Sequence, residues 1–139
     1  MDIKTRITSN GKKEILDPIR CRYVICTPEE EVRQTYLLYL INVLNVPKIA
    51  ISVEKEIKYN QLQRRYDIVV FSKGECLLIV ECKSPSVNLS QETLYQIATY
   101  NSVLQAKYIV LFNGKQELIL EKSLGNYFPC KTLPDYKKM

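Results

Sequence analysis

Two segments of the chain carry apolar residues at the spacing of an amphipathic helix. The first begins with TPEE, in which Thr27 is suited to be the N-cap and Pro28 the first helical residue. We expect this helix to run to about Leu44, and the second to span residues 89–105 with Ser90 as its cap. The apolar stripe of the first helix consists of Tyr36, Leu37, Leu40, Ile41 and Leu44.

Other segments have the composition of β-strands. The apolar runs IVVF and CLLIV are nearly continuous, which indicates strands covered on both faces, as in the middle of an α/β sheet. Asn113-Gly114 marks a tight turn between the last two strands. The expected strands are 20–26, 49–57, 66–71, 76–82, 108–112 and 116–120.

The order of these elements predicts an α/β fold, with a mixed central β-sheet flanked by helices in three layers. The length of 139 residues is enough for one domain. Residues 1–19 are polar and charged around an Asn10-Gly11 turn signal, so they form either a loosely attached arm or an edge hairpin. We therefore expect an N-terminal arm at 1–19, the folded domain at 20–120 and a C-terminal tail at 121–139.

The composition narrows the chemistry that the chain can perform. It contains no histidine, which excludes Ser-His and Cys-His catalysis and any histidine-ligated metal. Its five cysteines form no C-x-x-C pair, which argues against structural zinc and for a reducing cytoplasm. No apolar run approaches the roughly 20 residues that cross a bilayer, and no signal-peptide stretch opens the sequence. An enzyme of this composition must rely on carboxylates and lysine.

One group of charged residues has the arrangement of a reactive site. Asp67 opens the strand DIVVF, and Glu81 and Lys83 close the strand LLIVECK. Because side chains alternate along a strand, Glu81 and Lys83 lie on the same face. If the two strands pair in an antiparallel hairpin through the Lys73-Gly74 turn, Asp67 comes to lie next to Glu81.

Two carboxylates and a lysine at one sheet edge suit a hard cation such as Mg²⁺, whose shell is completed by waters and a substrate phosphate. The metal would lower the pKa of a bound water and polarise the phosphorus, while Lys83 positions the nucleophile or neutralises charge on the phosphate. The alternative is that these charges cap strand ends and form a surface ion pair. That alternative is the commoner origin of a single D…E-x-K match.

Five segments in a fixed order extend the comparison beyond this short motif. They are TPEEEVRQ (27–34), RRYDIVVF (64–71), LLIVECKSP (77–85), QIATYN (96–101) and YIVLFNG (108–114). On these segments the sequence resembles the PD-(D/E)xK nuclease superfamily, and more closely the domain at the N-terminus of type I restriction enzyme R subunits. The resemblance spans about residues 20–120. It implies a restriction-endonuclease-like core with Asp67, Glu81 and Lys83 as catalytic residues and Mg²⁺ or Mn²⁺ as cofactor.

The resemblance also adds candidates outside the short motif. Many such nucleases carry a glutamate in the first helix that reaches toward the metal, and Glu30 takes that position on the sheet-facing side of the helix. As the third helical residue after Thr27, Glu30 is alternatively an ordinary capping-box partner. The resemblance thus implies Asp67, Glu81 and Glu30 as the metal ligands.

Two further pairs of residues are candidates for contact with the site or with DNA. Gln96 and Tyr100 share one helical face and resemble the Q-x-x-x-Y pattern that braces the site or touches DNA in some superfamily members. Their alternative is the plain surface of an amphipathic helix. Arg64 and Arg65 can bind phosphate as arginine forks do, or form a solvated pair beside a turn.

The sequence favours a Mg²⁺-dependent DNA endonuclease or related phosphodiesterase in a restriction or DNA-processing system. The alternative is a non-catalytic nucleic-acid-binding or assembly module that keeps the fold, and RNA stays open as a substrate. The net charge of +5 permits attraction to phosphate but is weak support. Without a G-x-x-x-x-G-K-[ST] loop, the chain is not expected to translocate DNA alone. Expected partners are DNA and other subunits of a restriction or repair system, with a homodimer left open and no membrane.

Overall fold

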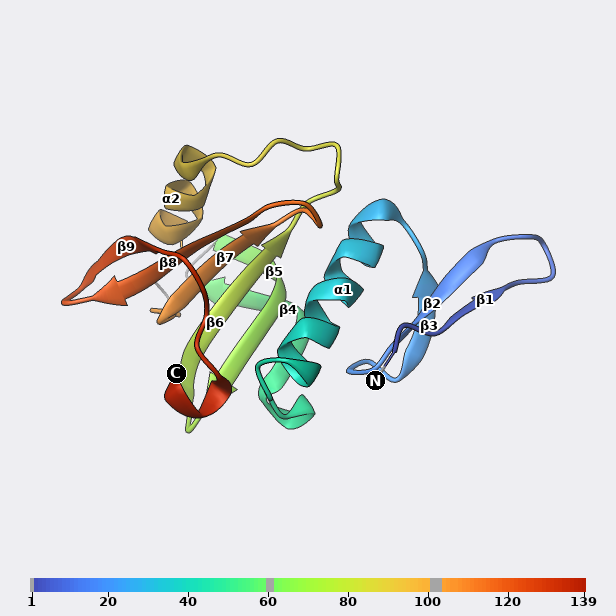
Figure 1. Cartoon of the computed structure of the whole chain (residues 1–139), viewed down its shortest axis with the longest axis horizontal. Helices are drawn as coiled ribbons and strands as arrows, with labels where there is room; N and C mark the ends of the chain where they lie inside the picture. The colour runs from blue at the N-terminus through green and yellow to red at the C-terminus, as the bar shows by residue number, and fades with distance from the viewer. Residues whose placement is uncertain (1, 60–61, 101–103) are drawn as a thin grey trace.

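The protein contains two β-sheets with one long helix between them (Figure 1). Its structure is a computed structural model that describes residues 2–59, 62–100 and 104–139. The smaller sheet is antiparallel, in the order β1-β2-β3. Its strands are β1 (Thr5–Ile7), β2 (Lys13–Asp17) and β3 (Arg22–Ile25).

The larger sheet has six strands in the order β4-β5-β6-β7-β8-β9. Only the β6–β7 pair is parallel among these neighbours, and the chain between those two strands crosses over through α2 (Gln91–Tyr100). The sheet is therefore mixed, as the sequence predicts. Its strands are β4 (Ile51–Tyr59), β5 (Leu62–Ser72), β6 (Glu75–Cys82), β7 (Tyr108–Phe112), β8 (Glu117–Ser123) and β9 (Asn126–Cys130).

The helices cover opposite faces of this sheet. α1 (Pro28–Asn42) contacts β5 and β6, and α2 contacts β7 and β8. Val69, Val70, Ile79 and Val80 are all fully buried, which confirms that the central strands are covered on both faces. The α/β fold with helices flanking a mixed sheet is thus confirmed. Two short 3-10 helices complete the chain, η1 (Lys48–Ala50) and η2 (Tyr136–Lys138).

The start of α1 follows its sequence signature. The Thr27 side chain accepts a hydrogen bond from the backbone N–H of Glu30 at 3.0 Å, and Pro28 occupies the first turn. Leu37 and Leu40 from the expected stripe are fully buried against the sheet. This geometry fixes which residues of the helix start face the strands, and Glu30 is among them.

Two elements differ from the sequence expectation. α2 ends at Tyr100 instead of reaching residue 105, where Gln105 has a φ of 54° that no α-helix accommodates. β9 lies in the segment expected to be a C-terminal tail, and its Pro129 is tolerated because the strand is at the edge of the sheet. The expected boundary at residue 120 falls inside β8, and the division into arm, domain and tail stays a prediction.

Of the two forms expected for the N-terminal segment, an arm or a hairpin, the structure shows the hairpin. β1 and β2 pair in antiparallel register around Gly11, whose φ of 81° suits the turn. Ile15 and Asp17 of β2 are buried, so the hairpin is attached to the body and not only to β3. Among the described residues, no helix is long and apolar enough to span a membrane.

Candidate active site

The candidate site lies where β5 and β6 stop pairing. Their ladder ends at the pair Ile68 and Val80, while β6 continues beside β7 to Cys82. At this point the Asp67 side chain replaces a strand carbonyl, because its Oδ2 accepts the backbone N–H of Cys82 at 2.8 Å. The divergence of the two strands thus brings the Asp67 carboxylate between them.

Glu81 lies against this carboxylate. Burial raises the pKa of Glu81 to about 8, and the charge of Asp67 and its hydrogen bond to Glu81 add to the rise. The positive charges of Lys83 and Arg64 oppose it. The structure therefore brings Asp67, Glu81 and Lys83 together as the antiparallel hairpin predicts. Arg64, one of the two candidate DNA-binding arginines, is close enough to act on Glu81 electrostatically.

Glu30 faces the sheet as expected but makes contacts that the sequence did not indicate. Its carboxylate forms ion pairs with Arg20 and Arg33, and it accepts a further hydrogen bond from Gln34 at 3.2 Å. The residue is 7% exposed. The contacts of the carboxylate thus run to these neighbours and not to the N–H of Thr27, as the capping box would require.

Arg33 joins Glu30 to the strand residues. Its Nη2 donates to Asp67 Oδ1 at 2.8 Å, and its Nη1 pairs with Glu30 and lies 3.4 Å from Glu54 Oε1. Although burial on its own lowers the pKa of Arg33, the Asp67 and Glu30 carboxylates outweigh it and raise the pKa. Sequence reasoning missed Arg33, although it follows Glu30 by three residues, the spacing of a helical ion pair.

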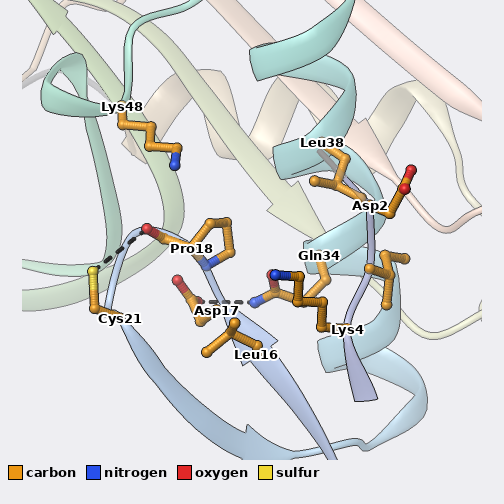
Figure 2. A pocket seen from close by; sticks show the side chains of 10 residues that line it. Asp2, Lys4, Leu16, Asp17, Pro18, Cys21, Gln34, Leu38 and Lys48 are labelled. Atoms are coloured by element: carbon orange, nitrogen blue, oxygen red, sulfur yellow. Dashed lines mark hydrogen bonds between the residues drawn. The ribbon is translucent and has the colours of Figure 1, made fainter.

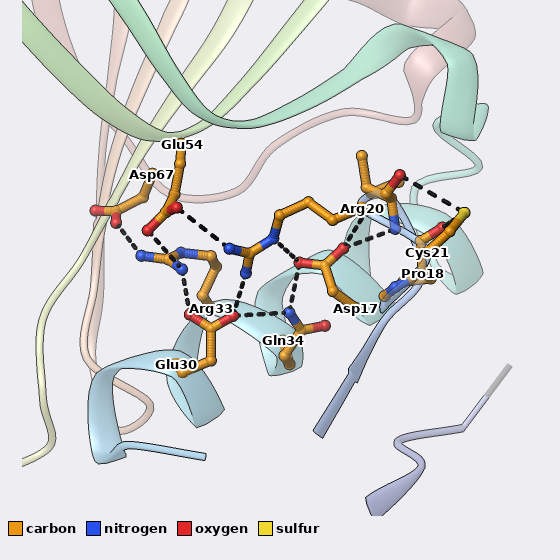
Figure 3. A network of polar contacts seen from close by, with 10 residues as sticks. Asp17, Pro18, Arg20, Cys21, Glu30, Arg33, Gln34, Glu54 and Asp67 are labelled. Atoms are coloured by element: carbon orange, nitrogen blue, oxygen red, sulfur yellow. Dashed lines mark hydrogen bonds and ion pairs between the residues drawn. The ribbon is translucent and has the colours of Figure 1, made fainter. Parts of the chain in front are cut away.

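Arg20 extends the same contacts to the N-terminal sheet (Figure 3). Its guanidinium pairs with Asp17 Oδ2 at 2.8 Å, with Glu54 Oε2 at 3.2 Å and with Glu30. Burial alone would raise the pKa of the fully buried Asp17, but hydrogen bonds from Arg20 and Gln34 lower it. We call this set the carboxylate–arginine network. Its members are Asp17, Arg20, Glu30, Arg33, Gln34, Glu54 and Asp67.

The remaining sequence candidates lie apart from the network. Gln96 is exposed on α2, and the side chain of Tyr100 lies outside the part of the chain whose side chains the structure describes. Arg65 is exposed and pairs with Glu56 at 2.9 Å. Gln96 makes no described contact with Asp67, and its role stays a prediction.

A comparison with protein-family models gives a match over residues 28–134, to the family described as type I restriction enzyme R protein N terminus (HSDR_N). The chain belongs to this family. The matched residues include α1, the β5–β6 divergence and all six strands of the larger sheet. A search of curated proteins finds no match. Because the family is described by a restriction enzyme subunit, membership places this chain in the context of a restriction system.

The network of this family member can be reached from the surface on two sides. An open depression of about 480 Å³ is lined by Glu30, Arg33 and Glu54 together with Ser84, which directly follows Lys83. A second hollow of about 350 Å³ lies at the N-terminal sheet, where Asp17 and Gln34 form part of its wall (Figure 2). The network thus runs through the protein between these two hollows.

The donor set of this R-protein domain fits a divalent cation in part. Among the described residues, no three acidic or cysteine side chains form a group that could hold a metal. The reason is visible in the network, where Arg33 lies between Glu30 and Asp67. The adjacent carboxyls of Asp67 and Glu81 remain, and one or two carboxylates with waters and a phosphate are enough for Mg²⁺. The expected three-carboxylate ligand set is not assembled.

Proposed function

We propose that this R-protein N-terminal domain is a Mg²⁺-dependent DNA endonuclease, or a related phosphodiesterase, of the PD-(D/E)xK type. The observation that carries the proposal is the pair of adjacent carboxyls, Asp67 and Glu81, with Lys83 beside them directly after β6. The family description, which names a restriction enzyme, supports the same conclusion. DNA is the substrate that a restriction system acts on, and RNA is an alternative for the test.

The electrostatics of the site support binding of a divalent cation. Four carboxylates of the network face two guanidinium groups, which leaves two negative charges without compensation. Burial and the charge of Asp67 raise the pKa of Glu81, although the positive charges of Lys83 and Arg64 oppose the rise. A cation of charge +2 at Asp67 and Glu81 offsets the uncompensated negative charge.

Each residue of the site has a distinct part in the proposed reaction. Asp67 and Glu81 would hold the metal, which supplies an activated water and polarises the scissile phosphate. Cys82 N–H and Arg33 hold the Asp67 carboxylate in place, one on each oxygen. Lys83 supplies positive charge where negative charge develops on the phosphate.

The proposal is tested by incubating supercoiled plasmid with the full chain and Mg²⁺ or Mn²⁺. We expect wild type to nick or linearise the plasmid, and Lys83→Ala to lower the rate on the order of 10²–10³-fold. Lys131→Ala is the matched control, since it removes the same charge from an exposed lysine beyond β9. Single-stranded DNA and RNA serve as further substrates. Intact nucleic acids with every common divalent ion would refute catalysis.

A second candidate function is a nucleic-acid-binding or assembly module without catalysis. The observation in its favour is that Glu30 is engaged by Arg20 and Arg33 and not available as a third ligand. Binding of DNA with no cleavage, equal in wild type and Asp67→Asn, is the expected result for this function. The expected partners in either case are DNA and other subunits of a restriction or repair system.

We propose the cytoplasm as the compartment in which the protein acts. All five cysteines are free thiols in the structure, including the buried Cys76 and Cys82. Free thiols persist in reducing compartments.

A further inference from the structure

The carboxylate–arginine network begins at a turn of the N-terminal sheet. Asp17, the last residue of β2, accepts hydrogen bonds from the backbone N–H of Ile19 at 2.8 Å and of Arg20 at 2.7 Å. The same carboxylate binds the Arg20 side chain and Gln34 of α1. The position of Arg20 is thereby fixed to the turn between β2 and β3.

One guanidinium then connects three elements of the fold. Arg20 contacts Asp17 from β2, Glu30 from α1 and Glu54 from β4. Because a guanidinium is planar and its donors have a fixed geometry, these contacts define the relative placement of the three elements. The N-terminal sheet is therefore coupled to the helix start that carries Glu30.

Arg33 carries this placement on to the β5–β6 divergence. Its Nη1 binds Glu30 and its Nη2 binds Asp67, so one planar group determines the distance between the two carboxylates. The Nε of Arg33 is buried without a hydrogen-bond partner among the described residues. Leaving a buried donor unpaired costs free energy, so the orientation of this guanidinium is governed by the two carboxylates that its Nη atoms bind and not by Nε.

We propose that Arg20 and Arg33 are positioning residues through which docking of the N-terminal sheet sets the Asp67 carboxylate. The proposal rests on the proposed function for its catalytic consequence, since Asp67 is the metal ligand there. The N-terminal sheet lies outside the family match, which begins at residue 28, yet it is part of the site through Arg20. The position of the Asp67 carboxylate therefore depends on the N-terminal sheet being docked.

The proposal differs in its consequences from a purely structural role. Buried ion pairs contribute little net stability but are costly to break, so a general loss of stability alone does not identify positioning. The informative readout is local: the amide of Cys82, which donates to Asp67 Oδ2, reports whether that carboxylate is in place. The amides of Ile79 and Val80, in the same strand but within the ladders, report general opening of β6.

The experiment measures amide hydrogen exchange by NMR in the full chain without metal. We expect Arg20→Gln to speed exchange at Cys82 by roughly tenfold relative to wild type, with Ile79 and Val80 little changed. Arg20→Lys, which keeps the charge but loses the fork, should give a smaller increase. Arg6→Gln is the matched control, because it breaks the exposed Arg6–Glu14 pair of the same sheet and should leave Cys82 unchanged.

The result that would overturn the proposal is Cys82 exchange that rises only in step with Ile79 and Val80, or not at all. If Arg20→Gln does not fold, Arg20→Lys and Arg33→Lys carry the same comparison. This readout needs no cleavage, so a failure of the proposed nuclease function is seen separately, as a wild type that exchanges as expected but leaves DNA intact. In an active enzyme, Arg20→Gln should lower kcat with KM nearly unchanged, and Arg20→Lys should recover part of it.

Discussion

The two faces of the six-stranded sheet are covered in different ways. On one face, Leu94 and Ile97 of α2 pack in an apolar cluster with strand residues such as Ile79. On the other face, Leu37 of α1 packs in an apolar cluster, but the start of α1 contacts the sheet through the carboxylate–arginine network. Apolar burial contributes stability in proportion to area, whereas buried ion pairs contribute little net stability. The α2 face thus stabilises the fold, and the start of α1 places charges.

The largest effect is expected from replacing Arg33, the arginine that binds both Glu30 and Asp67. Arg33→Met leaves the Glu30 and Asp67 carboxylates partly buried without their shared partner. We expect the free energy of unfolding to fall by about 3–5 kcal/mol, measured by urea denaturation. Adding Glu30→Gln to the variant should restore part of the loss, because one uncompensated charge is removed. A loss smaller than about 1 kcal/mol would contradict a tightly desolvated network.

On the opposite face, an apolar truncation should affect stability and not chemistry. Leu94 is fully buried, so Leu94→Ala leaves a cavity under α2 and should lower the free energy of unfolding by about 2–4 kcal/mol. The cleavage rate per folded molecule should stay at the wild-type value. A rate that falls more than the folded fraction would mean that the α2 face also places the reactive groups.

The titration of Glu81 makes the stability of the fold depend on pH. The pKa of Glu81 is about 8 in the folded state against 4.5 as the ordinary value, so the folded state holds an extra proton between these pH values. The contribution of Glu81 to stability therefore falls as pH rises from 4.5 to 8. Glu81→Gln does not titrate, and its stability relative to wild type should rise across this window, by at most about 1.4 kcal/mol per pH unit.

The measurement is urea denaturation of both proteins without metal at pH 5 and pH 8. Asp135→Asn is a suitable comparison, because hydrogen bonds from Asn45 and Lys137 lower the pKa of Asp135 and no titration is expected in this window. A difference between Glu81→Gln and wild type that does not change with pH would contradict the raised pKa.

The smallest effect is expected at the exposed pair of Arg65 and Glu56. Arg65→Gln should leave the urea midpoint unchanged, because ion pairs in solvent contribute little. If Arg65 contacts phosphate, the variant should weaken DNA binding and reduce its salt dependence by about one contact. An unchanged salt dependence would leave Arg65 as a surface pair only.

The sequence was sufficient for the elements whose signals are local. Thr27 and Pro28 predicted the start of α1, and the alternation around Glu81 and Lys83 predicted their shared position beside Asp67. These features depend on neighbours within one helix turn or one hairpin. β9 was missed because residues 121–139 were assigned to a tail, and its Pro129 is compatible with a strand only at the sheet edge, a position that the local sequence does not show.

The network could not be predicted because its contacts join distant positions. Arg20 meets Glu54, 34 residues away, and Arg33 meets Asp67, also 34 residues away. In the sequence Arg20 belongs to a short β-prone run and Glu54 to an ordinary strand, with no spacing that relates them. The inward direction of Glu30 was predicted from helical periodicity, but its partners depend on how two sheets pack around one helix.

The hydrogen bond from Cys82 to Asp67 bears on how active and inactive members of such a family can be told apart. A carboxylate or amide oxygen at this position is needed to end the β5–β6 ladder, whatever the protein does. A chain that had lost catalysis would therefore still be under selection for an acceptor there. Lys83 is not required by the fold in this way, because its ammonium group makes no hydrogen bond among the described residues. Loss of the lysine is consequently the earlier and more informative sign of lost activity.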